Sequence, residues 1–540
     1  MVATPLLGIA SATYLFGAVS THFQYAADLG VFSVLSPFVY VAFLLLFIAF
    51  SLYVLGGNYN FALMTAILIG VLFSLLGYLI LGPGGSETNY VGAVGYLTAT
   101  RYVMSSRIGN LIAVSPQYGG WPGPIALYGS LLTVLGVNSS SAVASVLIVS
   151  QVALVAFAIL LVYVVSRKAF GMSPIASLIA TVVFASFEHF VPAVMDDIGL
   201  SYILFILTYF LLLKKRTGNE FVSMLPLVAI AVSNFYASLM MMPVVAVYTI
   251  ATKRVRISLI YLSILTAWLV LYVSPNYTSL ANYFAVSVLN FSILFGAVTA
   301  ATTSGSPAHT IVVLVEIVLY ASVVGLAVLR FSFDTLRNGF RAIGPKTLIV
   351  SFILSINVTT FLLGPAFGVN PIESLERAAY FVLPLSFMII FDGFKTRIHL
   401  SAALLILVLL LPVLVISLYS PVQTTFVSTG ETYSGQFIQS RSVIGQTLFS
   451  LAPSYYSAPG VNIYYFTNPA YLYRSNILQI SVSEGKPIAL GKGLTTVGTQ
   501  TKVLFQLLSG SSYLYDETVL SLAKSSDVVY SNANVFVFKY

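Results

Sequence analysis

The sequence predicts a polytopic α-helical membrane protein of about 12–13 spans, with a small C-terminal domain of mixed α/β structure. The first observation is composition: of 540 residues, 58% are hydrophobic and only 7% are charged. Soluble domains carry about 25% charged residues, so this chain cannot be a soluble enzyme, a disordered protein or a nucleic-acid-binding module. The second is that many apolar runs reach the ~20 residues that a helix needs to cross a bilayer. The third is a change of composition after Ser420.

The apolar runs are expected to form the membrane-spanning helices of the cell-membrane, multi-pass part of the chain. They cover 31–55, 61–82, 142–166, 174–193, 198–213, 222–251, 257–273, 309–330, 347–366, 379–392 and 399–420. The run 222–251 is interrupted at Ser233-Asn234-Phe235, which predicts a pair of short helices. Residues 3–20 fit either a further span or a helix in the interface.

The positions of Lys and Arg predict the orientation. Fourteen basic residues fall in one set of alternate connections: Arg167, Lys168, Lys214, Lys215, Arg216, Lys253, Arg254, Arg256, Arg330, Arg337, Arg341, Lys346, Lys395 and Arg397. The other set holds three: Arg101, Arg107 and Arg377. The positive-inside rule places the first set in the cytoplasm. This parity requires that 123–137 and 287–303 do not cross the membrane, so these segments are expected to be interfacial or re-entrant.

Two domains follow from this topology. Residues 1–420 form the transmembrane domain, with a large outer loop at 83–141. Residues 421–540 form an extracytoplasmic domain rich in Ser, Thr, Tyr and Gly. Its short apolar runs at 528–530 and 535–538 are typical of β-strands. The absence of Cys excludes disulfides and thiol chemistry.

Acidic residues are rare enough to weigh one by one. Glu188 and Glu316 lie in or near apolar spans, where a carboxyl group is either protonated and structural or lines a cavity. Asp334 and Asp392, beside cytoplasmic basic residues, are expected to be solvated loop charges.

The remaining acidic residues gather on the outer side. Glu87 lies in the first outer loop, Asp196 and Asp197 form the tip of an outer hairpin, and Arg377 lies in the last outer loop beside Glu373 and Glu376. A carboxylate can accept a proton from an acceptor nucleophile, and an Arg can hold a phosphate bidentately. This combination suits transfer of a group from a lipid phosphate carrier. The simpler alternative is that these are ordinary charges at helix ends.

Several short motifs occur in a characteristic order along the chain. Glu87 and Tyr90 in the first outer loop are followed by a Pro-rich segment at 118–124, a basic-aromatic-Gly turn at 167–171 and the second acidic site at 195–197. This order resembles that of the GT-C glycosyltransferases, polytopic enzymes that use polyprenyl-phosphate-linked sugars and include protein mannosyltransferases, aminoarabinose transferases and oligosaccharyltransferases. The segment 376–380 is similar to a late span that in this family often carries an Arg facing the lipid-linked phosphate, and 526–538 is similar to the closing strand pair of archaeal members.

The resemblance implies a membrane glycosyltransferase that transfers sugar from a polyprenyl-phosphate carrier at the outer face. Glu87 would be the general base or acceptor-orienting carboxylate, Asp196 or Asp197 would assist or hold Mg²⁺ or Mn²⁺, and Arg377 would neutralise the lipid phosphate. The partners would be the lipid-linked sugar, the bilayer and a membrane or surface protein, and no nucleic acid.

The chain also departs from the family pattern. The first acid is Glu rather than the commoner Asp, the second site is not an Asp-x-Asp motif, and no Trp-Trp-Asp motif occurs in 421–540. A non-catalytic membrane subunit that anchors a partner through its outer domain is therefore the alternative. A transporter would need a polar path through the spans, for which only Glu188, Glu316 and His189 are candidates.

Overall fold

The computed structural model describes the helical part of the chain and five strands in its last part. The described residues are 2–21, 35–81, 123, 125–137, 140–187, 197–214, 219–268, 270, 307–338, 344–363, 371–419, 447–450, 462–464, 494–497, 527–532 and 535–539.

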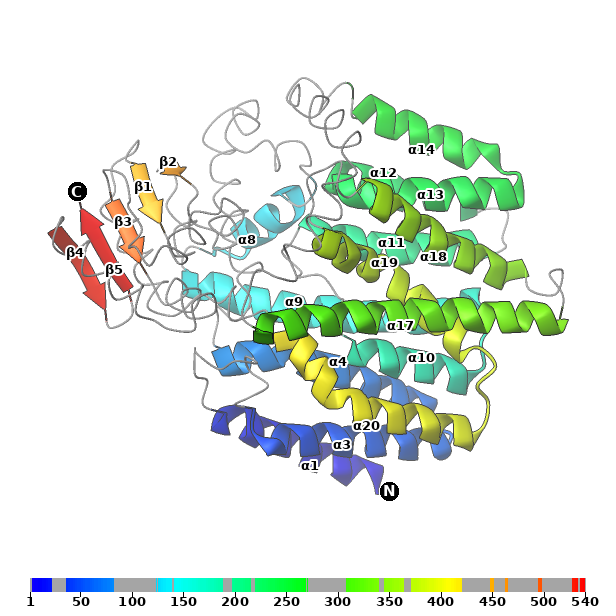
Figure 1. The fold of residues 1–540 in the computed structure, drawn as a ribbon, viewed down its shortest axis with the longest axis horizontal. Coiled ribbons are helices and arrows are strands. Elements are labelled where there is room, and N and C mark those ends of the chain that lie inside the picture. Colours follow the sequence, from blue (N-terminus) through cyan, green and yellow to red (C-terminus); the bar gives the residue numbers. More distant parts are fainter. Residues whose placement is uncertain are drawn as a thin grey trace.

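The helices pack side by side into one bundle (Figure 1). Their bounds are α1 (Ala3–Ser20), α3 (Pro37–Leu55), α4 (Tyr59–Leu81), α9 (Ser140–Val164), α10 (Pro174–Ser186), α11 (Asp197–Leu213), α12 (Asn219–Ser233), α13 (Phe235–Thr252), α14 (Val255–Trp268), α17 (Pro307–Asn338), α18 (Gly344–Leu363), α19 (Pro371–Phe391) and α20 (Arg397–Tyr419). A π-helical turn η2 (Val165–Ala169) extends α9, and a short turn η1 (Ile125–Gly129) leads into α8 (Ser130–Val134).

Six of the described helices are long and apolar enough to cross a membrane: α1, α3, α4, α9, α17 and α20. Seven shorter apolar helices complete the bundle: α10, α11, α12, α13, α14, α18 and α19. The prediction of a multi-pass helical membrane protein is therefore confirmed. The number of spans, about 12–13, stays a prediction.

Three of the predicted helix boundaries and segments fall on residues that the structure describes. The interruption at 233–235 is confirmed, because α12 ends at Ser233 and α13 begins at Phe235. Residues 125–137 form only the two short elements η1 and α8, too short to cross a bilayer. The segment 287–303 lies outside the described residues. Residues 3–20 form α1, whose Tyr14 is fully buried against Phe43 of α3, with ring centroids 5.8 Å apart.

Successive helices run in alternate directions, so their basic connections meet at one end of the bundle. Lys346 at the start of α18 lies 2.6 Å from Asp392, which follows α19. Ser173, before α10, donates to the carbonyl of Phe394 at 3.2 Å. We call this the basic end. Its described Lys and Arg residues are Arg167, Lys168, Lys214, Lys253, Arg254, Arg256, Arg330, Arg337, Lys346, Lys395 and Arg397.

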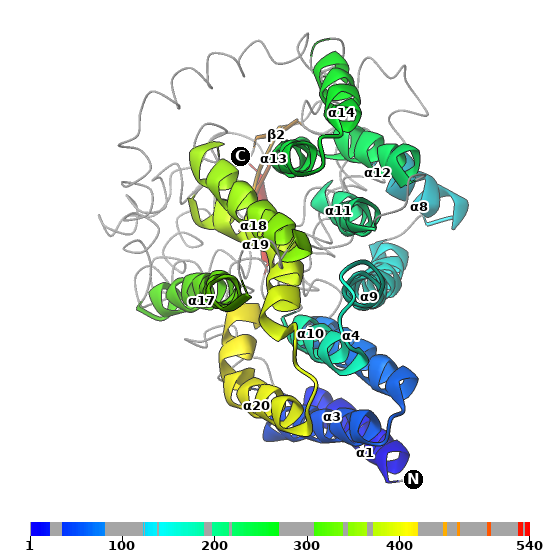
Figure 2. The ribbon, with the colours of Figure 1, turned by 90° about the vertical axis from the view of Figure 1, so that its right-hand side faces the viewer.

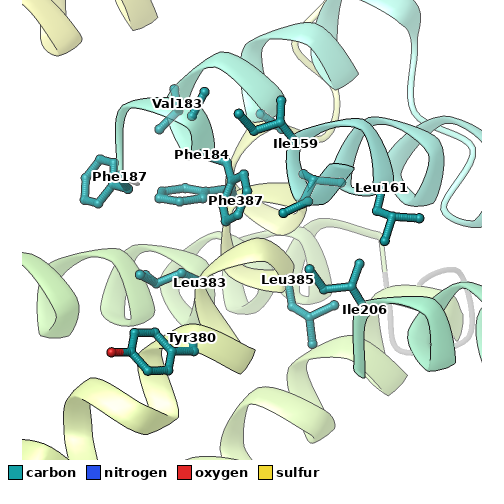
Figure 3. Packing of buried hydrophobic residues seen from close by; sticks show 14 of the residues in the cluster. Ile159, Leu161, Val183, Phe184, Phe187, Ile206, Tyr380, Leu383, Leu385 and Phe387 are labelled. Atoms are coloured by element: carbon teal, nitrogen blue, oxygen red, sulfur yellow. The ribbon is translucent and has the colours of Figure 1, made fainter. Parts of the chain in front are cut away.

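The centre of the bundle is formed by α10 and α19, which other helices surround (Figure 2). Every residue of α10 from Ala176 to Ser186 is buried. Figure 3 shows Phe184 of α10, and Phe187 directly after it, beside Phe387 of α19; the ring centroids of Phe187 and Phe387 lie 5.1 Å apart. Because lipid tails are as apolar as the side chains, close packing holds such helices together.

Small residues permit this close packing. A Cβ atom on Gly70 of α4 would lie 2.4 Å from Cδ1 of Ile159 in α9 and 3.3 Å from the carbonyl oxygen of Ala185 in α10. The three helices can therefore approach at this level because position 70 has no side chain.

An ion-pair network ties three elements together at the basic end. The Lys346 ammonium lies 2.6 Å from a carboxylate oxygen of Asp334 in α17 and 2.6 Å from one of Asp392. Arg330 adds a 3.6 Å contact to Asp334 and donates to the Asp392 carbonyl at 3.4 Å. The expectation of a solvated loop charge is therefore wrong for Asp334, whereas Asp392 lies in the turn after α19, as expected, but is paired with Lys346. Asp334 belongs to a helix that continues two turns beyond the predicted end at Arg330, and it is 8% exposed.

The described strands of the last part form one mixed sheet in the order β2-β1-β3-β5-β4. The strands are β1 (Thr447–Ser450), β2 (Asn462–Tyr464), β3 (Leu494–Val497), β4 (Asp527–Asn532) and β5 (Val535–Lys539). β1 pairs in parallel with β2 and β3, and β5 is antiparallel to β3 and β4. No helix is described after Tyr419, so the α/β character and the exported position of this domain stay predictions.

Replacing Lys346 by Met should lower the free energy of unfolding by about 1–3 kcal/mol, because two partly buried carboxylates lose their shared cation. Thermal unfolding of the detergent-solubilised protein measures this loss. The control is Arg337→Met, since Arg337 is an exposed cation on the same end of α17. Equal stability of the two variants would contradict a stabilising role for the network.

Candidate functional site

The structure describes two of the four predicted site residues. Asp197 is the first residue of α11, and Arg377 lies in the second turn of α19. Glu87 and Asp196 lie outside the described residues. By analogy with paired catalytic carboxylates, the carboxyl group of Glu87 is expected within ~10 Å of that of Asp196 or Asp197, and this stays a prediction.

The expected outer loop around Arg377 is corrected by the structure. Glu373, Glu376 and Arg377 belong to α19, which begins at Pro371 instead of near residue 379. A Pro at the first helical position and acidic residues in the first turn both favour a helix start here. Arg377 is therefore held on a helix, which fixes its position more firmly than a loop would.

The guanidinium group of Arg377 stacks on an aromatic ring. Its central carbon lies 5.4 Å from the centroid of Tyr236, a residue of α13 that is 6% exposed. Arg377 itself is partly buried. A cation over an aromatic face gains about 0.5–2 kcal/mol, with the larger values in desolvated sites. The contact joins α13 to α19 and orients the cation.

Arg377 stands apart from the other cations of the bundle. Among the helical residues that the structure describes, it is the only Lys or Arg away from the basic end. We call the end where α11, α13 and α19 begin the Arg377 end. An Arg in or near an apolar bundle costs at least a few kcal/mol unless it meets water, an anion or a polar partner.

The helices α11 and α19 bring Asp197 to the same end. Tyr202 and Phe205 of α11 both contact Phe381 of α19, with ring centroids 6.4 and 4.2 Å apart. One turn further along each helix, Ile206 and Leu385 point toward one another (Figure 3). The two helices therefore run in the same direction. Asp197 precedes Ile206 by nine residues and Arg377 precedes Leu385 by eight, so their backbones lie toward the same end of the two helices.

The break between α12 and α13 positions Tyr236. Asn234 leaves the helical conformation, and its side-chain oxygen accepts a hydrogen bond from the backbone N–H of Ala237 at 2.8 Å. The Ser238 hydroxyl donates to the carbonyl of Ile230 at 3.0 Å, which also accepts from the backbone N–H of Asn234 at 3.2 Å, so the two helices are tied across the break. Such caps stabilise a helix start by about 1 kcal/mol. Tyr236 is thus the second residue of a firmly capped helix.

The outer segment that precedes α8 contacts this break. A Cβ atom on Gly123 would lie 2.6 Å from the Ser233 hydroxyl and 3.0 Å from the Ser233 Cα. Only glycine permits this approach. Gly123 belongs to the Pro-containing segment 118–124, so a residue of one predicted motif packs against the end of α12, directly before the helix that carries Tyr236.

Tyr236 was not predicted as a site residue. Its place two residues after an Asn that interrupts an apolar run is the sequence signal that could have found it.

A metal site was predicted at Asp196 or Asp197. The described residues include no group of three or more His, Cys, Asp and Glu side chains that could hold a metal ion. The Asp196 and Asp197 side chains are outside this description, so a Mg²⁺ or Mn²⁺ site there stays a prediction.

Gly123→Ala should destabilise the protein by about 1–3 kcal/mol, because the added methyl group overlaps the backbone and side chain of Ser233. Thermal unfolding in detergent measures the change. Gly325→Ala in α17 is the matched control, since a Cβ there meets nothing within 4 Å. If both variants unfold at the same temperature, the contact with Ser233 does not stabilise the fold.

Tyr236→Leu should lower stability by about 1–2 kcal/mol through loss of the ring beneath Arg377. Tyr236→Phe keeps the ring and should remain close to the original protein. Differential scanning fluorimetry of the two variants gives their unfolding temperatures and so distinguishes the contribution of the aromatic ring from that of the hydroxyl group. A Phe variant as unstable as the Leu variant would assign the effect to the hydroxyl group instead.

Comparison with known proteins does not assign the chain to a family. No family model matches the sequence, and no curated protein matches it. The resemblance to GT-C glycosyltransferases therefore rests on the short motifs quoted from the sequence.

Proposed function

We propose that this chain is a membrane glycosyltransferase that transfers a sugar from a polyprenyl-phosphate carrier at the outer face of the membrane. In this proposal Arg377 binds the lipid phosphate, Glu87 orients or deprotonates the acceptor, and Asp196 or Asp197 assists or holds a divalent cation. The domain at 421–540 helps to bind the acceptor.

One observation carries the proposal: a guanidinium group fixed on an aromatic ring, at the end of the bundle opposite to the other Lys and Arg residues that the structure describes in the helical part. A helical membrane protein has little reason to keep an Arg there unless an anion or polar group meets it. The planar guanidinium group of Arg can donate two parallel hydrogen bonds to the oxygens of a phosphate. Stacking on Tyr236 already orients this group, so less side-chain entropy is lost when the phosphate binds.

The chemistry assigns each residue a step. The acceptor nucleophile attacks the anomeric carbon of the sugar, the bond from that carbon to the phosphate oxygen breaks, and the polyprenyl phosphate leaves with both bonding electrons. A carboxylate such as Glu87 takes the proton of the acceptor. Arg377 stabilises the charge that develops on the departing phosphate, the kind of preorganised electrostatic effect that contributes most in many enzymes. The beginning of α11 supports this arrangement, because it brings the backbone of Asp197 to the same end of the bundle as Arg377.

The alternative is a non-catalytic membrane subunit that assembles a partner through its outer domain. A pre-organised Arg would then contact a protein carboxylate. This alternative predicts that a partner co-purifies in stoichiometric amount and that the outer carboxylates tolerate replacement.

The test compares surface glycans of cells that carry Glu87→Gln, Asp197→Asn or Arg377→Gln with those of unaltered cells, by mass spectrometry. We expect Arg377→Gln to reduce transfer about 10²-fold or more, as for removal of a preorganised donor. Glu87→Gln should reduce it by about 10²–10⁴-fold, as for loss of a general base.

The control is Arg337→Gln at the basic end, which should leave the glycans unchanged. Immunoblots show whether each variant accumulates normally. Unchanged glycans with normal amounts of Glu87→Gln and Asp197→Asn protein would reject the catalytic role. A stoichiometric partner in the same preparation would favour the subunit.

A further inference from the structure

The short connection from α19 to α20, residues 392–396, links these two helices to their neighbours at the basic end. The hydroxyl of Ser173, which caps the start of α10, donates to the carbonyl of Phe394 at 3.2 Å. Arg330 of α17 donates to the carbonyl of Asp392 at 3.4 Å. The conformation of this connection therefore affects how α10, α17, α19 and α20 are held together (Figure 1).

A histidine caps the start of α20. The side chain of His399, in the first turn, reaches back over the connection. Its Nδ1 atom accepts from the backbone N–H groups of Lys395 and Thr396, at 3.3 and 3.4 Å. Nδ1 also lies 3.0 Å from the Thr396 hydroxyl, which accepts from the backbone N–H of His399 at 3.4 Å. This is the reciprocal arrangement of a capping box, with His in the place that Glu or Gln usually takes.

These contacts determine the protonation state of the imidazole ring. A nitrogen that accepts from two backbone N–H groups must carry a lone pair, so the single proton of the neutral ring is on Nε2. A second proton would bind to Nδ1 and point at the same two donors. The Thr396 hydroxyl can turn and accept from this proton. The backbone N–H groups of Lys395 and Thr396 can only donate, so they would lose their acceptor.

An aromatic stack holds the imidazole ring in this position. The rings of His399 and Phe394 lie 4.6 Å apart between centroids, with their planes 21° apart. Phe394 in turn contacts Phe391 of α19 at 5.3 Å. The stack therefore orients the imidazole relative to the end of α19. Residues 395–398, between the two stacked rings, are exposed, so protons from water can reach the cap.

The charges around His399 disfavour a further positive charge. Lys395 and Arg397 lie beside it in the sequence, and the N-terminal end of a helix repels a cation. The nearest opposing charge in the connection, Asp392, is already paired with Lys346. The helices packed against α20 are α3, α10 and α17. Among the described residues α10 has no charged or titratable group, and the basic ends of α3 and α17 have Tyr53, Arg330, Asp334 and Arg337.

We propose that His399 is a proton-sensitive cap of α20. When the imidazole is neutral, it holds the connection 392–396 against the first turn of the helix. When a proton from water binds to Nδ1, the N–H groups of Lys395 and Thr396 turn to water and this turn opens. The proposal does not depend on the proposed function, because the cap lies at the end of the bundle opposite to Arg377.

The direction of the pH dependence follows from the lost acceptor. The folded cap disfavours the protonated ring, so the cap stabilises the connection while the ring is neutral. This stabilisation is lost as the pH falls through the range in which histidine takes up a proton, from about pH 7.5 to about pH 5.5.

Hydrogen–deuterium exchange of the detergent-solubilised full chain tests the proposal, because it reports local opening of the peptide that covers residues 393–400. Each variant is compared with the unaltered protein at the same pH, so that differences in intrinsic exchange rate cancel. His399→Gln keeps an acceptor that does not titrate, and His399→Leu removes the acceptor. At about pH 7.5 the Gln variant should match the unaltered protein, and the Leu variant should exchange about fivefold faster, as for loss of one helix cap.

At about pH 5.5 the unaltered protein should exchange as fast as the Leu variant, while the Gln variant stays protected. The matched control is His309→Gln in the first turn of α17, which should keep the pH response of the unaltered protein. An unaltered protein that matches the Gln variant at both pH values would overturn the proposal, and this comparison still decides if the Leu variant does not fold. Equal exchange of the Gln and Leu variants would show that the acceptor does not stabilise the connection. Loss of the pH response in His309→Gln would assign it to a different histidine and would also overturn the proposal.

Discussion

The cost of charge in apolar surroundings is the constraint on which this structure depends. A Lys, Arg, Asp or Glu among lipid-facing helices destabilises the protein by several kcal/mol unless it reaches water or a partner. The chain meets the constraint in two ways. Most of the Lys and Arg residues that the structure describes in the helical part lie at one end, and Asp334, which enters a helix there, is paired with Lys346.

At the Arg377 end of the bundle, the cost of a buried charge is met in a different way. Arg377 is tolerated there because Tyr236 offers its ring. The break at Asn234 is essential to this arrangement, since it starts a new helix whose first turn carries Tyr236. The helical interruption, the aromatic ring and the cation therefore form one unit, to which Gly123 attaches the preceding outer segment.

Much of the bundle could be predicted because the signals are local. A long apolar run needs no knowledge of its neighbours to be recognised as a helix, and the Asn at position 234 marks the break between α12 and α13. The errors arose where tertiary contacts decide. The predicted span ends at Arg330 because the apolar run ends there, but α17 continues to Asn338, and Asp334 in this extension pairs with Lys346.

The candidate site was harder to predict than the bundle. Arg377 could be singled out because it is a rare cation on its side, but its partner Tyr236 lies far away in sequence and only packing brings the two together. Glu87 and Asp196 lie outside the described residues, so their predicted roles rest on sequence alone.

The hydrogen bonds of Asn357 have a consequence for biosynthesis. Asn357-Val358-Thr359 has the sequence of a glycosylation acceptor. In the folded bundle, however, its amide nitrogen donates to the carbonyl of Ile353 at 2.8 Å and its oxygen accepts from Tyr320. An enzyme that attaches glycans could reach this nitrogen only on an extended chain, before α18 has formed. Insertion of the helix therefore closes the acceptor, and the order of synthesis and folding decides whether this position is modified.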